Sequence, residues 1–285
     1  MKCTNCGEET ADFMCSCVVC GYNLGYPNVR AALLNAEVNA LKDRVEKVEN
    51  DINLKKCDSI LKDFRDTVAH SSAVINCSLD KINEFASSDN NLYQTFYQAV
   101  GSESRLPENN VWDEARNVAD SLLFPFYKEH IHFASLSINQ RGVTYYGECC
   151  MVLKDLSIQE RATVFEENST QFIENNNIRV GGHIPYGYRA SWKERELLAV
   201  AKLGKRLTSK TNKKEFSEIL ASSNKKESFD FIEVHIYGPI SRRAIKYLSY
   251  HESKLTPHRK RKSDKVLFKA ISRKLKDIGV NTEIF

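Results

Sequence analysis

No stretch of this 285-residue sequence is apolar enough to cross a membrane, because no run of about 18 apolar residues occurs. The chain also lacks the apolar segment of a secretory signal, since Met1-Lys2 leads directly into cysteine-rich sequence. Glycine and proline are few, at 12 and 6 residues, which argues against global disorder. We therefore expect a folded, cytoplasmic protein without a membrane partner.

The sequence also lacks the even, dispersed set of cysteines that a secreted disulfide framework requires. Five of the nine cysteines fall within the first 20 residues, and the others are Cys57, Cys77 and the adjacent pair Cys149-Cys150. An odd number with this clustering indicates a metal site and reduced thiols in a reducing compartment.

Four of the early cysteines form the pattern C-x2-C-x10-C-x2-C, with ligands Cys3, Cys6, Cys17 and Cys20. Zinc prefers four thiolates in a tetrahedron, and each C-x2-C turn supplies two of them. We therefore expect a structural zinc ribbon. Cys15 is an extra candidate that can replace Cys17 in the ligand set.

The formal net charge of +4 is distributed unevenly along the chain. Ten Lys or Arg and a single acid, Asp264, lie between Lys254 and Lys276, so the remainder of the chain is net acidic. Such a basic end favours a nucleic-acid partner. The alternative is a solvated terminal helix.

The pattern of residues divides the chain into three parts: a zinc ribbon over 1–26, a long helix over 27–75, and a larger domain over 76–285 that ends in a basic helix. Apolar residues of the long helix recur at heptad spacing, at Leu34, Val38, Leu41, Val45, Val48 and Ile52. This seam either packs on the chain's own domain or forms a coiled coil with a partner, including a second copy.

Strand patterns in the larger domain occupy 132–138, 143–153, 162–165 and 229–237, and helix patterns occupy 112–127, 192–207 and 263–278. Residues 71–110 have a broken helical pattern. The expected fold class is therefore α+β.

The strand over 229–237 holds the strongest catalytic candidate. Its alternation places Ile232, Val234 and Ile236 on one face, which we expect to be core. Glu233 and His235 then share the opposite face. This face either forms the floor of a substrate cleft or is the solvated face of an edge strand.

The order of these segments resembles bacterial ADP-ribosyltransferase-like toxin domains over about residues 132–250. The segments that carry the resemblance are Tyr146-Gly147, Arg161-Ala-Thr163 through Asn168-Ser169, and Glu233-Val-His235-Ile-Tyr-Gly238-Pro239. The resemblance implies a mixed split β-sandwich with flanking helices and an NAD-binding cleft. In that family the strand glutamate, here Glu233, stabilises an oxocarbenium-like transition state.

The resemblance further implies that the position of His235 influences the choice of acceptor. Tyr146 or Arg161 would replace the first-strand Arg or His of standard members. Gly147, Asn168 and Ser169 belong to the matched segments, which we expect to border the NAD site.

Two arginines and a tryptophan are further candidates for holding NAD. The guanidinium groups of Arg161 and Arg189 match phosphate oxygens, although surface ion pairs are an alternative role. Trp192 is suited to stacking on a base or on nicotinamide, with core packing as its alternative.

Three functions are compatible with the sequence. The first is an NAD-dependent ADP-ribosyltransferase that modifies a macromolecule such as RNA or DNA, in a toxin–antitoxin or anti-phage setting where a partner or antitoxin protein would control it. The second is a non-enzymatic nucleic-acid-binding or adaptor protein. The third is a zinc-ribbon nuclease, for which the only acidic cluster is Glu166-Glu167.

Overall fold

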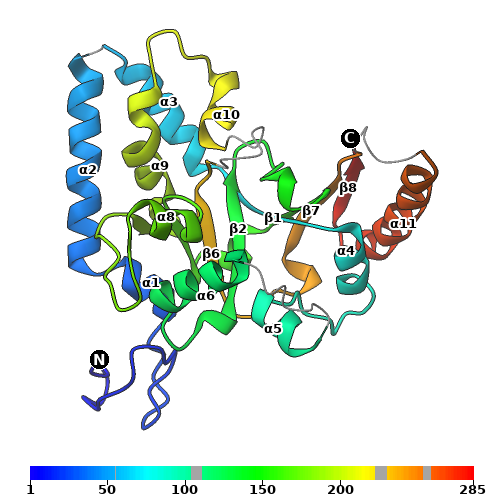
Figure 1. The fold of residues 1–285 in the computed structure, drawn as a ribbon, viewed down its shortest axis with the longest axis horizontal. Coiled ribbons are helices and arrows are strands. Elements are labelled where there is room, and N and C mark those ends of the chain that lie inside the picture. Colours follow the sequence, from blue (N-terminus) through cyan, green and yellow to red (C-terminus); the bar gives the residue numbers. More distant parts are fainter. Residues whose placement is uncertain (55, 104–110, 222–229, 253–257) are drawn as a thin grey trace.

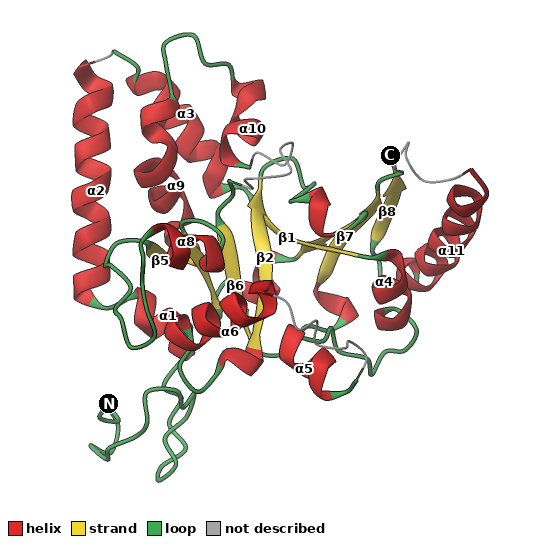
Figure 2. Ribbon diagram, in the orientation of Figure 1, coloured by secondary structure: helices red, strands yellow, loops and turns green. Residues whose placement is uncertain are grey.

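The computed structural model describes residues 1–54, 56–103, 111–221, 230–252 and 258–285. In these residues a small N-terminal ribbon adjoins an α+β unit built on one eight-stranded sheet (Figures 1 and 2). The strands are β1 (Ser72–Cys77), β2 (Ile131–Ser137), β3 (Cys149–Leu153), β4 (Ala162–Phe165), β5 (Arg189–Ser191), β6 (Glu233–Tyr237), β7 (Ile245–Tyr250) and β8 (Asn281–Ile284).

Eleven α-helices lie in the described part of the chain and pack around this sheet (Figure 2). They are α1 (Pro27–Ala32), α2 (Asn35–Leu54), α3 (Asp58–Ala69), α4 (Leu79–Phe85), α5 (Phe96–Gly101), α6 (Val111–Leu123), α7 (Asp155–Ile158), α8 (Ser169–Asn175), α9 (Arg195–Leu203), α10 (Phe216–Leu220) and α11 (His258–Lys276).

The sheet is mixed, with strand order β5-β4-β6-β2-β1-β3-β7-β8, and all its neighbours are antiparallel except the parallel pair β7–β8. β1 and β2 pair over three residue positions only, from Ser72↔Ser137 to Val74↔Ser135. The sheet turns at this short junction, so that β2 and β6 run steeply while β1 runs across the view (Figure 1). The α+β class is confirmed, but the split β-sandwich is not, because the described strands form one continuous sheet.

β6 is a central strand with both faces covered. Ile232, Val234 and Ile236 are fully buried in the main core, as the alternation predicts. Glu233 and His235 are 4% and 2% exposed on the opposite face, which a second apolar cluster from α6 and α8 covers. The edge-strand alternative is therefore wrong.

The heptad seam packs on the chain's own domain. Leu41, Val45, Val48 and Ile52 are buried in the same core as the strands, with α9 alongside, whereas Leu34 is half exposed. The single helix expected over 27–75 is wrong: helices α1, α2 and α3 occupy this range, and β1 begins within it at Ser72.

The sequence located some elements well and missed others. The strands expected at 132–138 and 162–165 correspond to β2 and β4, and the two later helices to α9 and α11. The helical expectation for 71–110 is wrong at β1, and β7 and β8 were not anticipated. Phe229, the expected start of the β6 strand, lies outside the described residues.

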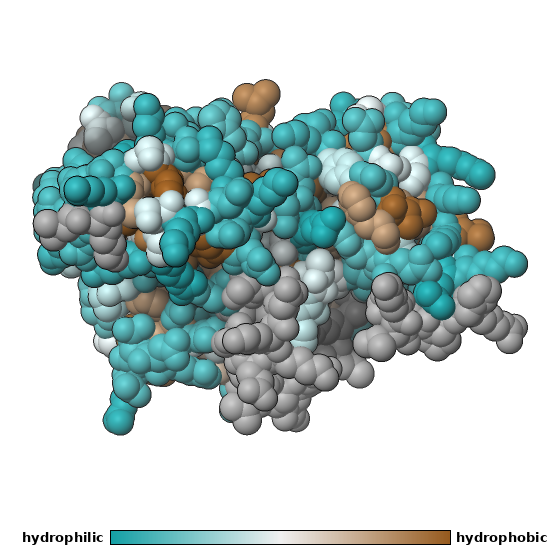
Figure 3. Space-filling view, turned by 90° about the horizontal axis from the view of Figure 1, so that it is seen from above, coloured by the Kyte–Doolittle hydropathy of each residue, from teal (hydrophilic) through white to brown (hydrophobic). Residues whose placement is uncertain are grey.

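In the part of the chain that the structure describes, no helix is long and apolar enough to span a membrane. The face seen from above is mostly hydrophilic, and apolar atoms come to its surface in separate places rather than as one band (Figure 3).

Candidate functional site

The four predicted zinc ligands meet at the N-terminal ribbon. The Sγ atoms of Cys3 and Cys20 lie 3.7 Å apart, those of Cys6 and Cys17 lie 3.6 Å apart, and all four fall within 4.8 Å of one another. A tetrahedron with zinc–sulfur bonds of about 2.3 Å has sulfur separations of about 3.8 Å. The four thiols therefore fit a structural zinc ion, with no position left for water.

Each pair of cysteines belongs to a tight turn that closes on a glycine. The Gly7 N–H donates to the Cys3 carbonyl, and the Gly21 N–H donates to the Cys17 carbonyl. Both glycines have positive φ, at 77° and 70°, a conformation that glycine adopts without a Cβ clash. These turns aim the two thiols of each pair at one point.

Cys15 is not part of this cluster. Its side chain instead interacts with the phenol of Tyr237, at the end of β6. Arg30 of α1 also secures the ribbon, because its guanidinium donates to four ribbon carbonyls, those of Asp12, Met14, Leu24 and Gly25. The zinc site therefore lies on a ribbon docked against the sheet domain.

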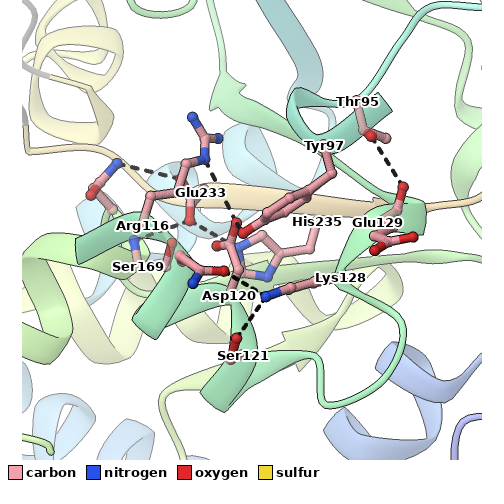
Figure 4. A network of polar contacts seen from close by, with 12 residues as sticks. Thr95, Tyr97, Arg116, Asp120, Ser121, Lys128, Glu129, Ser169, Glu233 and His235 are labelled. Carbon is pink, nitrogen blue, oxygen red and sulfur yellow. Dashed lines mark hydrogen bonds and ion pairs between the residues drawn. The ribbon is translucent and has the colours of Figure 1, made fainter. Parts of the chain in front are cut away.

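Glu233 is the centre of a second, buried site. One carboxylate oxygen accepts hydrogen bonds from the Ser169 backbone N–H at 3.1 Å and from His235 Nε2 at 2.9 Å. Asn168 Nδ2 lies 3.5 Å from the other oxygen. β6 carries Glu233 and His235, and Ser169, the first residue of α8, faces the carboxylate (Figure 4). Asn168 is the N-cap residue of the same helix. The result is a negative charge in a fixed orientation with little access to water.

His235 lies two residues after Glu233 on the same face of β6. Its ring packs against Phe124, Phe133 and Phe165, with centroids 4.8–5.7 Å away. An ionised carboxylate only accepts hydrogen bonds, so this contact with an ionised Glu233 requires the His235 tautomer that carries a proton on Nε2. The geometry therefore places His235 between the Glu233 carboxylate and three aromatic rings.

A polar group from α5 and α6 adjoins this pair. The Tyr97 hydroxyl donates to Asp120 Oδ2 at 2.8 Å, and Arg116 Nε lies 3.6 Å from the same oxygen (Figure 4). Asp120 is fully buried, and no described residue forms a hydrogen bond with its Oδ1 atom. Burial raises the pKa of Asp120 to about 6, Arg116 and Tyr97 oppose the rise, and Glu233 adds to it.

Tyr146 lies at the outer side of the site and is half exposed. Burial of its phenol raises its pKa to about 12, Glu233 adds to the rise and Arg116 opposes it. Its neighbour Gly147 fits a close backbone approach, because a Cβ there would lie 2.2 Å from the Cys77 carbonyl carbon. Asn168 caps α8 by accepting from the Gln171 N–H.

Of the three predicted NAD-binding residues, Arg161 and Trp192 lie away from this group, whereas Arg189 lines a small cavity together with His235. Arg161 donates to the carbonyls of Tyr237 and Ser157, beyond the far end of β6 from Glu233. Arg189 pairs with the buried Glu37 of α2. Trp192 is 1% exposed, with the Arg195 guanidinium over its ring. The structure thus brings together Glu233, His235, Tyr146, Asn168 and Ser169, next to Gly147.

The sequence did not predict that Tyr97, Arg116 and Asp120 belong to this site. The available signal was an acid four residues after an arginine in α6, at the margin of its apolar face, where Ala119 and Leu123 are buried. Nothing in the sequence connects that helix with β6.

Comparison with known proteins adds no relative: no protein-family model matches the chain, and no curated protein matches it.

Proposed function

We propose that the chain is an NAD-consuming ADP-ribosyltransferase whose catalytic carboxylate is Glu233. The observation that carries the proposal is the buried, oriented carboxylate, held by the Ser169 N–H and His235 on a central strand. The order of the matched segments supports the same reaction class, since Tyr146, Asn168 and Ser169 gather around this carboxylate.

The chemistry follows from where charge develops. When the bond between the ribose C1′ and the nicotinamide nitrogen breaks, its electron pair leaves with nicotinamide and positive charge builds on the ribose. A carboxylate already fixed beside that ribose stabilises the cation without reorganising during the reaction. The acceptor nucleophile then forms a bond to C1′ and loses its proton.

Substitution of His235 tests whether its hydrogen bond orients the Glu233 carboxylate for catalysis. We expect His235→Leu to slow nicotinamide release and transfer to an acceptor together, by about ten- to hundred-fold, because a hydrogen bond to a charged group contributes about 1.5–3 kcal/mol. The kcat should fall while KM for NAD changes little. His235→Gln, which retains an N–H donor, should recover part of the kcat.

The rates of NAD hydrolysis and of transfer in the His235→Leu variant distinguish two roles of His235: orienting Glu233 and selecting the acceptor. A loss of transfer with unchanged NAD hydrolysis would assign His235 to acceptor choice and contradict its role as a support. A loss with no recovery in His235→Gln would also contradict that role.

A second candidate function is non-enzymatic nucleic-acid binding, which the exposed face of α11 favours. The buried residues Phe268, Ile271 and Leu275 anchor this helix to the core. Its opposite side carries cations at helical spacing, all exposed: Lys262, Lys269, Arg273 and Lys276. Such a stripe suits the phosphates of a nucleic acid. It is also compatible with an enzyme that modifies RNA or DNA.

Charge substitution tests this stripe without removing the buried side of α11. Replacing its four cations with Gln should weaken RNA or DNA binding and flatten its salt dependence, since each phosphate contact contributes about 0.9 to the logarithmic slope. The measurement is affinity over a series of salt concentrations. A matched control removes the same charge from exposed lysines elsewhere: Lys193, Lys205, Lys213 and Lys214. Equal losses in both variants would indicate net charge alone and contradict a binding face.

A further inference from the structure

The Arg116 guanidinium is held between aromatic rings and donates no hydrogen bond to the residues that the structure describes. It lies over the rings of Phe96 and Phe133, 4.9 and 4.8 Å from their centroids. Its only ion-pair partner in the described residues is Asp120, at 3.6 Å from Nε, which is too long for a hydrogen bond. The buried Nε accordingly has no hydrogen-bond partner within the described part of the chain, and the side chain as a whole is 32% exposed.

This guanidinium belongs to the Glu233 site. Both Glu233 and Arg116 are close enough to the phenol of Tyr146 to shift its pKa, in opposite directions. The same two groups also shift the pKa of Asp120. Arg116 therefore offers a positive group next to the fixed negative one (Figure 4).

The other arginines considered for phosphate binding are already engaged. Arg161 is bound to two backbone carbonyls, and Arg189 to the carboxylate of Glu37. Arg161 thus uses Nε and Nη1, and Arg189 uses Nε, for contacts within the protein. Arg116 makes no hydrogen bond to the described residues, so its planar fork can meet phosphate oxygens.

We propose that Arg116 binds the phosphates of the dinucleotide in the Glu233 site, with Asp120 and the two phenylalanine rings setting its orientation. This inference rests on the proposed function for the identity of the ligand, which is a nucleotide with a diphosphate group. The chemistry of the residue requires only an anion with several oxygens, because a guanidinium fork matches such oxygens two at a time.

The test is binding of ADP-ribose and of inorganic pyrophosphate to the full chain by calorimetry. We expect Arg116→Gln to weaken both ligands at least ten-fold and Arg116→Lys to recover only part, since lysine lacks the planar fork. Adenosine, which has no phosphate, should bind both proteins equally. Arg141→Gln is the matched control, because Arg141 also lies over an aromatic ring, that of Phe285.

Two results would overturn the inference. One is an unchanged affinity of Arg116→Gln for both phosphate ligands. The other is an equal loss in Arg141→Gln, which would indicate a diffuse charge effect. If the wild-type chain releases nicotinamide while Arg116→Gln binds both phosphate ligands as tightly as wild type, the phosphate-binding role of Arg116 is wrong and the transferase proposal is retained. If pyrophosphate binding depends on Arg116 but NAD is never consumed, the anion site is supported and the transferase proposal is rejected.

Discussion

Glu233→Gln is expected to lower the rate of nicotinamide release from NAD by about 10²–10³, because one preorganised electrostatic group contributes on the order of 3–4 kcal/mol to a transition state. The substitution retains the volume of the side chain and its carbonyl oxygen can still accept from the Ser169 N–H. The fold should therefore persist while the charge is lost. Steady-state kinetics and thermal melting of the same preparation measure both quantities.

A purely structural Glu233 predicts the opposite pair of results. Neutralising a buried carboxylate that two donors hold would then shift the melting temperature and leave NAD chemistry untouched. A wild-type rate in a stably folded Glu233→Gln protein would remove the reason to regard this chain as an enzyme.

Removal of zinc is the second change for which a large effect is expected. The apolar cluster of the ribbon is small, with Cys3, Cys17, Leu24 and the partly buried Met14. So few side chains cannot offset the entropy of ordering the segment, so the metal must supply the folding free energy, about 10–16 kcal/mol in zinc-finger peptides. Chelation should therefore unfold residues 1–26, which hydrogen exchange of that segment measures.

Two single substitutions give this prediction a matched control. Elemental analysis should find one zinc per wild-type chain, well under one in Cys17→Ser, and one in Cys15→Ser, because Cys15 lies outside the cluster. A full equivalent in Cys17→Ser, or little zinc in wild type, would contradict the assigned ligand set.

The sequence predicted those parts of the fold that a local pattern specifies. The C-x2-C pairs identified the metal cluster, and alternation identified β2, β4 and the two faces of β6. β1 was missed because its six residues follow α3 almost directly and combine small, polar and branched side chains. β8 was missed because it has only four residues and no buried face.

The candidate site was predictable in part for the same reason. Glu233 and His235 belong to one strand, so their shared face follows from its period of two. Asp120 and Arg116 reach the site from α6, and only tertiary packing brings that helix to β6. The engagement of Arg189 likewise depends on Glu37, 152 positions away in sequence.

The direct test of the central claim is the fate of NAD labelled in separate samples on nicotinamide and on adenine, incubated with zinc-loaded wild-type chain. If the chain is a transferase, the nicotinamide label is released while the adenine label appears in ADP-ribose or on a macromolecule. Glu233→Gln should release far less in the same time. Recovery of both labels in intact NAD, with and without added RNA, DNA or protein, would show that the chain does not consume NAD.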